Sequence, residues 1–227
     1  MLDLQGYGPQ ILEGAGVTVL VALCSLIVAC VLGMVTALAK LSEARLSRLV
    51  AGVYTTIIRG IPDLLLMLII FFGGQVLVNR LAPMVGYDAY IDINPFMAGV
   101  LTIGFIFGAY MGETFRGAIL AVPHGQIEAA RAFGMTPNKV FFRITLPQMV
   151  IHALPGFGNN WLVLLKTTAL VSIIGLDDMV RKANLAAGST REPFTFYFAV
   201  ALIFLLLTTL SIWALRWAEK RYSVGLG

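Results

Sequence analysis

Long apolar runs restrict the fold of this chain more than any other feature of its sequence. The run from Ala15 to Ala39 contains no charged residue, and comparable runs recur along the chain. A transmembrane helix needs about 20 mostly apolar residues, because the hydrocarbon core of a bilayer is about 30 Å thick. Only 12% of the 227 residues are charged, whereas a soluble domain carries about 25% charged residues. The sequence therefore predicts a polytopic membrane protein.

Five stretches are long and apolar enough to cross a bilayer. They cover about residues 15–39, 49–78, 95–115, 149–176 and 194–217, and we predict a transmembrane helix in each. Arg59, Pro62 and Asp63 interrupt the second stretch, and the proline predicts a break in that helix. The predicted fold class is all-α, with a single transmembrane domain over residues 1–227.

Basic residues gather in alternate loops, which indicates how the chain is oriented. They are Lys40, Arg45 and Arg48 after the first span, Arg116, Arg131, Lys139 and Arg143 between the third and fourth, and Lys220 and Arg221 after the fifth. Cytoplasmic loops carry an excess of lysine and arginine. We therefore expect the N-terminus outside and the C-terminus in the cytoplasm. Because the basic residues lie in short loops between apolar segments, the net charge of +4 does not indicate nucleic-acid binding.

A polar helical hairpin is predicted at about residues 121–147, between the third and fourth spans. The segment QIEAARAF contains good helix formers and places a carboxylate in its first turns. Gly134 is placed to end this helix in a left-handed conformation. Thr136 then offers an N-cap, with Pro137 at the first position of a second short helix, which Pro147 is expected to end. Neither helix is long enough to cross a bilayer.

The residues alone leave two interpretations of this hairpin open. It is either an amphipathic connector that rests on its own bundle or a docking element for a soluble partner. An apolar stripe at Val140, Phe141 and Ile144 is compatible with both.

The hairpin sequence EAARAFGMTPNKVFFRITLP resembles the coupling-helix signature of ABC importer permeases. The matching positions are Glu128, Ala129, Ala130, Gly134, Ile144, Leu146 and Pro147. Further motifs follow the same order along the chain, namely RGIPDLLLMLIIFFG, GAYMGETFRGAILAVPHGQIEAA, ALPGFGNNWLVLLKTTALVS and REPFTFY. Together they resemble the polar amino-acid uptake family, including its histidine and lysine–arginine–ornithine, opine and arginine permeases.

The resemblance implies a type I ABC importer in a bacterial inner membrane. It implies three partners besides membrane lipid: a second permease subunit, an ABC ATPase dimer, and a periplasmic or extracellular amino-acid-binding protein. The implied function is ATP-driven uptake of histidine, arginine, lysine, ornithine or an opine by alternating access. The ATPase would bind ATP and magnesium. This chain has no Gly-x-x-x-x-Gly-Lys-Ser/Thr loop, and we expect it to bind no cofactor and to catalyse no reaction.

The resemblance also assigns a role to the hairpin. Glu128, with Ala129, Ala130 and Gly134, is expected to dock in a groove of the ATPase. The small residues allow close backbone approach, and the carboxylate can pair with a basic group or a backbone donor.

Arg59 and Asp63 lie four residues apart around Gly60 and Pro62 in the second span. Charged groups in a bilayer segment usually face the bundle interior or a water-filled cavity, and broken helices often mark substrate sites in transporters. One interpretation is that this pair lines the substrate path, as the resemblance also implies. The other is that Arg59 and Asp63 form an ion pair across the break.

The fourth span contributes Asn160, Trp161, Lys166 and Thr168 to the predicted substrate path. Homomeric arginine permeases of the resembling family carry an acidic residue directly after this lysine, where this chain has Thr167. A cationic substrate needs a nearby carboxylate in a low-dielectric cavity. We therefore expect a heterodimer, in which a different second permease supplies the anionic contact.

Other polar residues predict local structure rather than chemistry. Glu113 and Arg116 are spaced for an intrahelical pair. Asp177 and Asp178 either contact the external binding protein or cap a short external helix, and we favour the cap. Metal-ligand spacing is absent from the sequence, as are hydrolase and protease motifs, so an intramembrane enzyme is disfavoured. The alternative function is a self-contained secondary transporter, although many of those show internal repeats and none stands out here.

Overall fold

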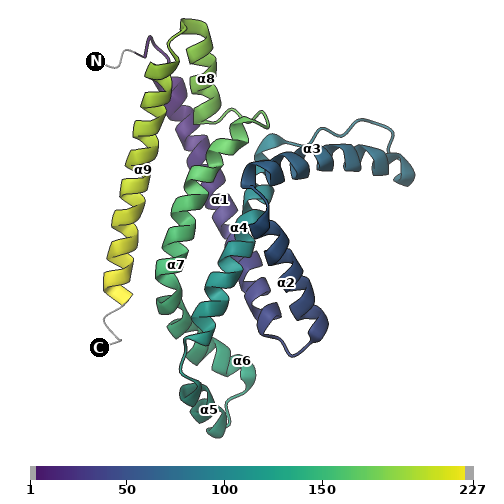
Figure 1. Ribbon diagram of the computed structural model, residues 1–227, viewed down its shortest axis with the longest axis vertical. Helices are drawn as coiled ribbons and strands as arrows, with labels where there is room; N and C mark the ends of the chain where they lie inside the picture. The colour runs from purple at the N-terminus through teal and green to yellow at the C-terminus, as the bar shows by residue number, and fades with distance from the viewer. Residues whose placement is uncertain (1–3, 223–227) are drawn as a thin grey trace.

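The chain folds into a bundle of long helices with a short hairpin at one end (Figure 1). The computed structural model describes residues 4–222. Its α-helices are α1 (Gly8–Leu41), α2 (Arg45–Gly60), α3 (Asp63–Leu81), α4 (Pro95–Leu120), α5 (His124–Ala132), α6 (Pro137–Val140), α7 (Leu146–Thr167), α8 (Met179–Thr190) and α9 (Pro193–Tyr222). Shorter turns are η1 (Ala82–Val85), η2 (Phe141–Thr145) and η3 (Thr168–Ser172). No strand occurs within residues 4–222, and the predicted all-α class is confirmed.

Five helical segments within residues 4–222 are long and apolar enough to cross a membrane, as the sequence predicted. They are Gly8–Leu41, Asp63–Val85, Pro95–Leu120, Pro137–Ser172 and Pro193–Arg221. The predicted start of the second span at Leu49 is wrong. The break at Ile61 and Pro62 is real, and it separates a 16-residue α2 from α3, so that only the second part is long enough to span.

The prediction that Pro147 ends the second helix of the hairpin is also wrong. Helix α6 continues into α7 through the π-turn η2, so that one helical segment runs from Pro137 to Ser172. The N–H of Leu146 donates to the carbonyl of Phe141, a five-residue bond that widens the helix locally. Pro147 follows directly and has no backbone N–H to donate. The helix tolerates it here because the regular helical hydrogen bonds are already interrupted at the π-turn.

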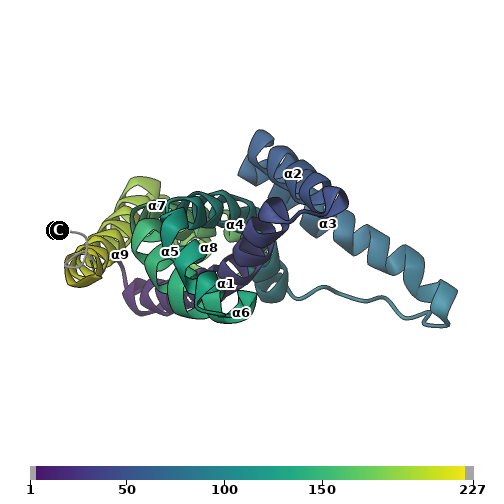
Figure 2. The ribbon, with the colours of Figure 1, turned by 90° about the horizontal axis from the view of Figure 1, so that it is seen from below.

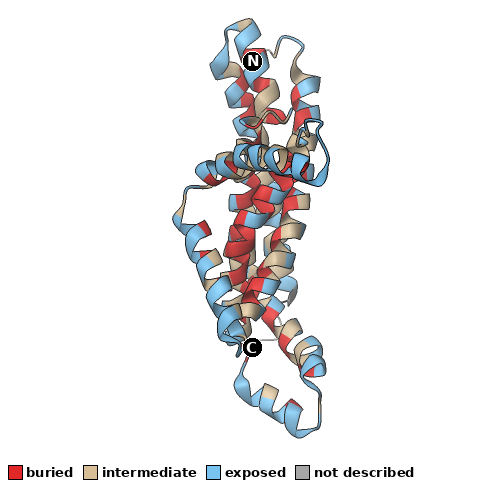
Figure 3. Ribbon diagram, turned by 90° about the vertical axis from the view of Figure 1, so that its right-hand side faces the viewer, coloured by how far each residue is buried: buried red, intermediate tan, exposed pale blue. Residues whose placement is uncertain are grey.

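Helix α4 lies at the centre of the bundle and packs closely against α1. Gly104, Gly108 and Gly112 face α1 at four-residue spacing. A Cβ added at these positions would lie 2.5–2.8 Å from side-chain atoms of Val28, Leu32 or Thr36. Small residues at such spacing let transmembrane helices approach closely. The buried residues accordingly follow the middle of the bundle, whereas the hairpin is mainly exposed (Figure 3).

A second packing cluster closes the upper end of the bundle in Figure 1, where α8 crosses α1 and α9. Met179, Ala183 and Phe196 are completely buried there. Asp178 is the N-cap of α8, since its Oδ1 accepts a hydrogen bond from the N–H of Arg181 at 2.9 Å. Capping by Asp178 was predicted and is confirmed, whereas Asp177 forms an exposed ion pair with Arg181 instead.

Helix α3 projects sideways out of the bundle in both Figure 1 and Figure 2. Only Leu66 and Met67, in its first turns, are buried. The loop between η1 and α4 leads back to the bundle. It is held against α3 by Gln75 and Asn79, whose side chains hydrogen-bond to the backbone of Ile91. Most of the apolar surface of α3 therefore remains uncovered by the described chain.

Candidate functional site

The hairpin α5–α6 is built by local interactions that the sequence indicated. Gly134 has φ +77°, as predicted for the residue that ends α5. The N–H of Met135 donates to the carbonyl of Ala130 and that of Gly134 to Arg131, which together form a Schellman motif. Thr136 occupies the N-cap position of α6, but its side chain caps none of the described backbone N–H groups. These turns fix the angle between two very short helices.

The docking residues expected on this hairpin are divided between its surface and its interior. Glu128 and Ala129 are exposed, whereas Ala130 is buried against the rest of the hairpin. Glu128 pairs with no basic group within residues 4–222. Phe133 is 90% exposed at the tip. Glu128 and Phe133 are thus both accessible on this short element.

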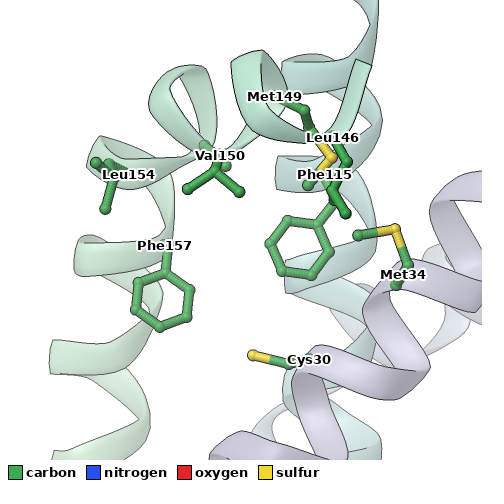
Figure 4. Close-up of a pocket in the computed structure, with 9 residues that line it drawn as sticks. Cys30, Met34, Phe115, Leu146, Met149, Val150, Leu154 and Phe157 are labelled. Carbon is green, nitrogen blue, oxygen red and sulfur yellow. The ribbon is translucent and has the colours of Figure 1, made fainter. Parts of the chain in front are cut away.

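The π-turn joins the hairpin mechanically to α7, next to an apolar cavity of about 280 Å³. Figure 4 shows Val150 and Phe157 on α7 facing Met34 and Phe115 across this space. The side chains of Gln148 and Gln126 are hydrogen-bonded at 2.5 Å and tie α7 to α5. The hairpin and α7 are therefore connected both through the backbone and by a side-chain hydrogen bond.

A polar cavity of about 410 Å³ lies between α1, α2 and α4. It is lined by Lys40, Thr55, Thr56, Arg59, Gly60, Tyr110 and Glu113. The break after Gly60 ends α2 there, so Arg59, in its last turn, borders this space. The ion pair between Arg59 and Asp63 that was one interpretation does not form. The Arg59 guanidinium lies instead over the ring of Tyr110, 5.5 Å from its centroid.

Glu113 holds two basic side chains at the edge of this cavity. The predicted pair with Arg116 is confirmed, with Arg116 Nε 3.0 Å from Glu113 Oε2. Lys40, at the end of α1, donates to the other carboxylate oxygen. The Lys40 and Glu113 side chains are only 16% and 20% exposed, respectively, so this pair also holds α1 against α4.

The residues predicted on the fourth span do not converge on the polar cavity. Asn160 is buried and donates to Thr114 Oγ1 at 2.9 Å. Trp161 lines a different, apolar pocket between α1, α7 and α9. Lys166 is exposed, and Thr168 is fully buried with its hydroxyl bonded to the carbonyl of Leu165. Of the six predicted path residues, only Arg59 lines the polar cavity. Asp63, at the start of α3, does not line it but interacts electrostatically with Tyr110, which does.

Sequence reasoning missed Lys40 and Tyr110 as neighbours of Arg59 and treated Glu113 as a local pair only. One signal was present, because each lone charge within or beside a span needs a partner or a cavity. Pairing Lys40 with Glu113 required knowing that α1 and α4 are adjacent. Within residues 4–222, no cluster of three or more histidine, cysteine or carboxylate side chains is arranged to hold a metal.

Comparison with known proteins defines the class. Residues 15–224 match the model of the family described as binding-protein-dependent transport system inner membrane component. The chain belongs to this family. It is therefore a multi-pass inner-membrane permease component, in agreement with the resemblance seen in its motifs.

Individual relatives are similar over nearly their whole length. The chain is 52% identical over 223 residues to HisQ, the histidine/lysine/arginine/ornithine transport system permease protein of Escherichia coli (strain K12), covering 98% of this chain and 97% of the relative. It is 44% identical over 220 residues to the nopaline transport system permease protein NocQ of Agrobacterium fabrum, covering 95% and 93%.

Solved structures agree with this assignment. A crystal structure of an amino acid ABC transporter with histidines superposes with a TM-score of 0.79 at 32% identity, covering 95% of both chains. An inward-facing structure of the MetNI methionine ABC transporter gives a TM-score of 0.69 at 18% identity, covering 94% of both chains. The second comparison shows a shared fold only.

Proposed function

We propose that this chain is a permease subunit of an importer for polar or basic amino acids, such as histidine, arginine, lysine, ornithine or an opine. The observation that carries the proposal is 52% identity, over 98% of the chain, to a permease named for four of these compounds. A polar cavity bordered by Arg59 and Glu113 supports it, because charged side chains in a membrane protein mark substrate pathways.

The proposed assembly contains a second permease subunit, an ABC ATPase dimer and an external amino-acid-binding protein, surrounded by membrane lipid. ATP and magnesium are bound by the ATPase, and this chain binds no cofactor. The second permease is a different chain, because the charged groups lining the polar cavity are Lys40, Arg59 and Glu113, and that carboxylate already has two basic partners. A cationic substrate would then find its anionic contact on the partner.

The orientation proposed is N-terminus outside and C-terminus in the cytoplasm of a bacterial inner membrane. The start of α1 and the end of α9 lie at opposite ends of the bundle (Figure 1), which suits an odd number of crossings. The hairpin, with Arg131, Lys139 and Arg143, lies at the same end as the last residues of α9, in accordance with the excess of basic residues on the cytoplasmic side.

Transport follows alternating access in this proposal. The ATPase grips Glu128, Ala129, Ala130 and Gly134 on the hairpin, and its closure on ATP moves the hairpin inward. Because α6 is continuous with α7, this movement tilts α7 towards α1 and α4. The remaining predicted path residues, Asp63, Asn160, Trp161, Lys166 and Thr168, then contribute to the surfaces that slide past one another or past the substrate.

Uptake by proteoliposomes tests the proposal. Vesicles holding this chain with its second permease and ATPase, supplied with binding protein and internal ATP, should accumulate a radiolabelled basic amino acid. Glu128→Lys should lower uptake at least tenfold, because the reversed charge opposes docking. Lys139→Gln is the control. It removes one charge at an exposed position of the same hairpin and should keep uptake within about twofold of the wild type.

Two results would contradict this proposal. Accumulation by vesicles that hold this chain alone, without ATPase, would indicate a self-contained secondary transporter. Unchanged uptake by Glu128→Lys would remove this residue from the docking surface while leaving the class of transporter intact.

A further inference from the structure

The polar cavity carries more positive than negative charge. Lys40, Arg59 and Glu113 line it, and Arg116 lies beside Glu113. Since Glu113 is already shared by Lys40 and Arg116, one carboxylate balances two cations before Arg59 is counted. Asp63 follows four residues after Arg59, yet within residues 4–222 Arg59 forms no ion pair with it or with any other carboxylate. The Asp63 carboxylate interacts electrostatically with Tyr110 without pairing with Arg59. Arg59 is thus a cation at this cavity whose donors remain available to an anion.

Tyr110 holds the Arg59 side chain in a way that leaves its donors available. The guanidinium carbon lies over the face of the ring, 5.5 Å from its centroid, and within residues 4–222 the N–H groups of Arg59 donate no hydrogen bond. The N–H donors of a guanidinium point outward in its plane and match a carboxylate in a two-bond arrangement. Stacking on the ring therefore orients the side chain without occupying the hydrogen bonds that would recognise a carboxylate.

The cavity also has a suitable size and environment. The cavity is open on one side, and its volume of about 410 Å³ is sufficient to hold one end of a small molecule. Its wall is completed by Thr56 and by the helix end at Gly60. The apolar pocket around Trp161 has no charged lining residue and offers no comparable contact for an anion.

We propose that Arg59 binds the α-carboxylate of the transported amino acid, with Tyr110 as the residue that positions its guanidinium. This rests on the proposed function, and it assigns one end of the substrate to this subunit. The cationic end is bound elsewhere, because Lys40, Arg59 and Arg116 repel it from this cavity. The subunit thereby selects for a free carboxylate, whatever the side chain of the substrate.

Direct binding to the assembled complex, without the external binding protein, tests this assignment. The probes are three matched pairs, in which each amine is the amino acid without its carboxylate: L-arginine and agmatine, L-lysine and cadaverine, and L-histidine and histamine. For the wild type, the transported amino acid should bind at least tenfold more tightly than its amine, because a charge-assisted contact is lost in the amine.

Variants locate the effect. Arg59→Gln should bring the affinity for the amino acid to within about threefold of that for the amine. Arg59→Lys and Tyr110→Leu should each retain part of the difference in affinity. Arg59→Lys keeps the positive charge but loses the planar group, and Tyr110→Leu keeps the guanidinium but loses the ring that orients it. Arg45→Gln is the control: Arg45 is an exposed arginine on the same helix, away from the cavity, and its loss should leave the ratio unchanged.

Size-exclusion chromatography establishes that each variant assembles, and Arg59→Lys provides a milder change if Arg59→Gln does not. An assembled Arg59→Gln or Arg59→Lys complex that discriminates amino acid from amine as strongly as the wild type would overturn the assignment. A wild-type complex that transports none of the three amino acids would overturn the proposed substrate class as well. Transport by the wild type, measured in parallel, distinguishes the two failures.

Discussion

Helices α4 and α3 are both apolar spans, yet they occupy opposite situations in the molecule. Inside the chain, 67% of the most apolar part of α4 is buried, compared with 11% for the span that contains α3. Helix α4 contacts α1, α2, α3 and α7, whereas α3 projects from the bundle (Figures 1 and 2). The more buried of the two spans is the less apolar one.

This difference teaches that burial in a membrane protein follows packing rather than hydrophobicity. Lipid tails are as apolar as leucine side chains, so there is little hydrophobic gain when one apolar helix covers another. Close contact is favoured instead by small residues and by polar groups that find partners. Helix α4 has both, in its glycine stripe and in Glu113, while α3 presents leucine, isoleucine and phenylalanine to its surroundings.

The largest expected effect separates the glycines of the two helices. At Gly104, an added Cβ would lie 2.5 Å from the Val28 side chain and 3.2 Å from the backbone oxygen of Ser25. Gly104→Leu should therefore destabilise the protein by about 3 kcal/mol or more, lowering the melting midpoint of the detergent-solubilised protein by roughly 6–12 °C. Gly74→Leu on α3 is the matched control, since its Cβ would meet no described atom within 4 Å.

The control is expected to leave the midpoint within about 2 °C of the wild type. If Gly74→Leu is as damaging as Gly104→Leu in the assembled importer, then another subunit covers α3, and the contrast holds only within the single chain. Thermal unfolding of the isolated chain and of the assembled complex would tell these cases apart.

A smaller effect is expected from the ion pairs. Glu113→Gln leaves Lys40 and Arg116 facing each other in a largely buried setting, and should cost about 2 kcal/mol. Asp177→Asn breaks the pair with Arg181 outside the spans, where the side chains are 72% and 40% exposed, and should cost under about 1 kcal/mol. The same melting assay compares them, and equal losses would mean that Glu113 is better solvated than its position indicates.

The smallest effect concerns pH and the buried cap of α8. Burial away from water disfavours the charged carboxylate and raises the pKa of Asp178 from 3.8 to about 6, although backbone hydrogen bonds oppose the shift. Its Oδ2 has no hydrogen-bond partner among the described atoms. The folded state thus binds the proton more tightly than the unfolded state, and stability rises as pH falls through 6. Between pH 7.5 and 5.5 this group alone should add about 0.8 kcal/mol.

Asp178→Asn keeps an acceptor for the cap but does not titrate. The difference between wild type and variant isolates the contribution of Asp178 from that of the other ionisable groups. Melting midpoints at the two pH values should show a gain for the wild type that exceeds that of the variant. Parallel curves would contradict a buried, ionisable carboxylate at this position.

The features predicted correctly from the sequence have one property in common, which is that their partners are close along the chain. The left-handed turn at Gly134, the cap at Asp178 and the pair of Glu113 with Arg116 all join residues within five positions of one another. Lys40 and Glu113 are 73 positions apart, and no local pattern connects them. The continuity of α6 and α7 was missed for a different reason, because a π-turn has no clear local signature and proline ordinarily ends a helix.

The sequence by itself determined how many segments cross the membrane, where the hairpin lies and which family the chain resembles. The length of an apolar run and the capping of a helix depend on residues that are close along the chain. The family motifs are recognised from their order in the sequence. Only the tertiary structure decided that α4 is central, that α3 is left uncovered and that Arg59 meets Tyr110 beside Glu113 in one cavity. Those facts depend on which helices approach closely, and that is settled by side-chain packing between segments far apart in the chain.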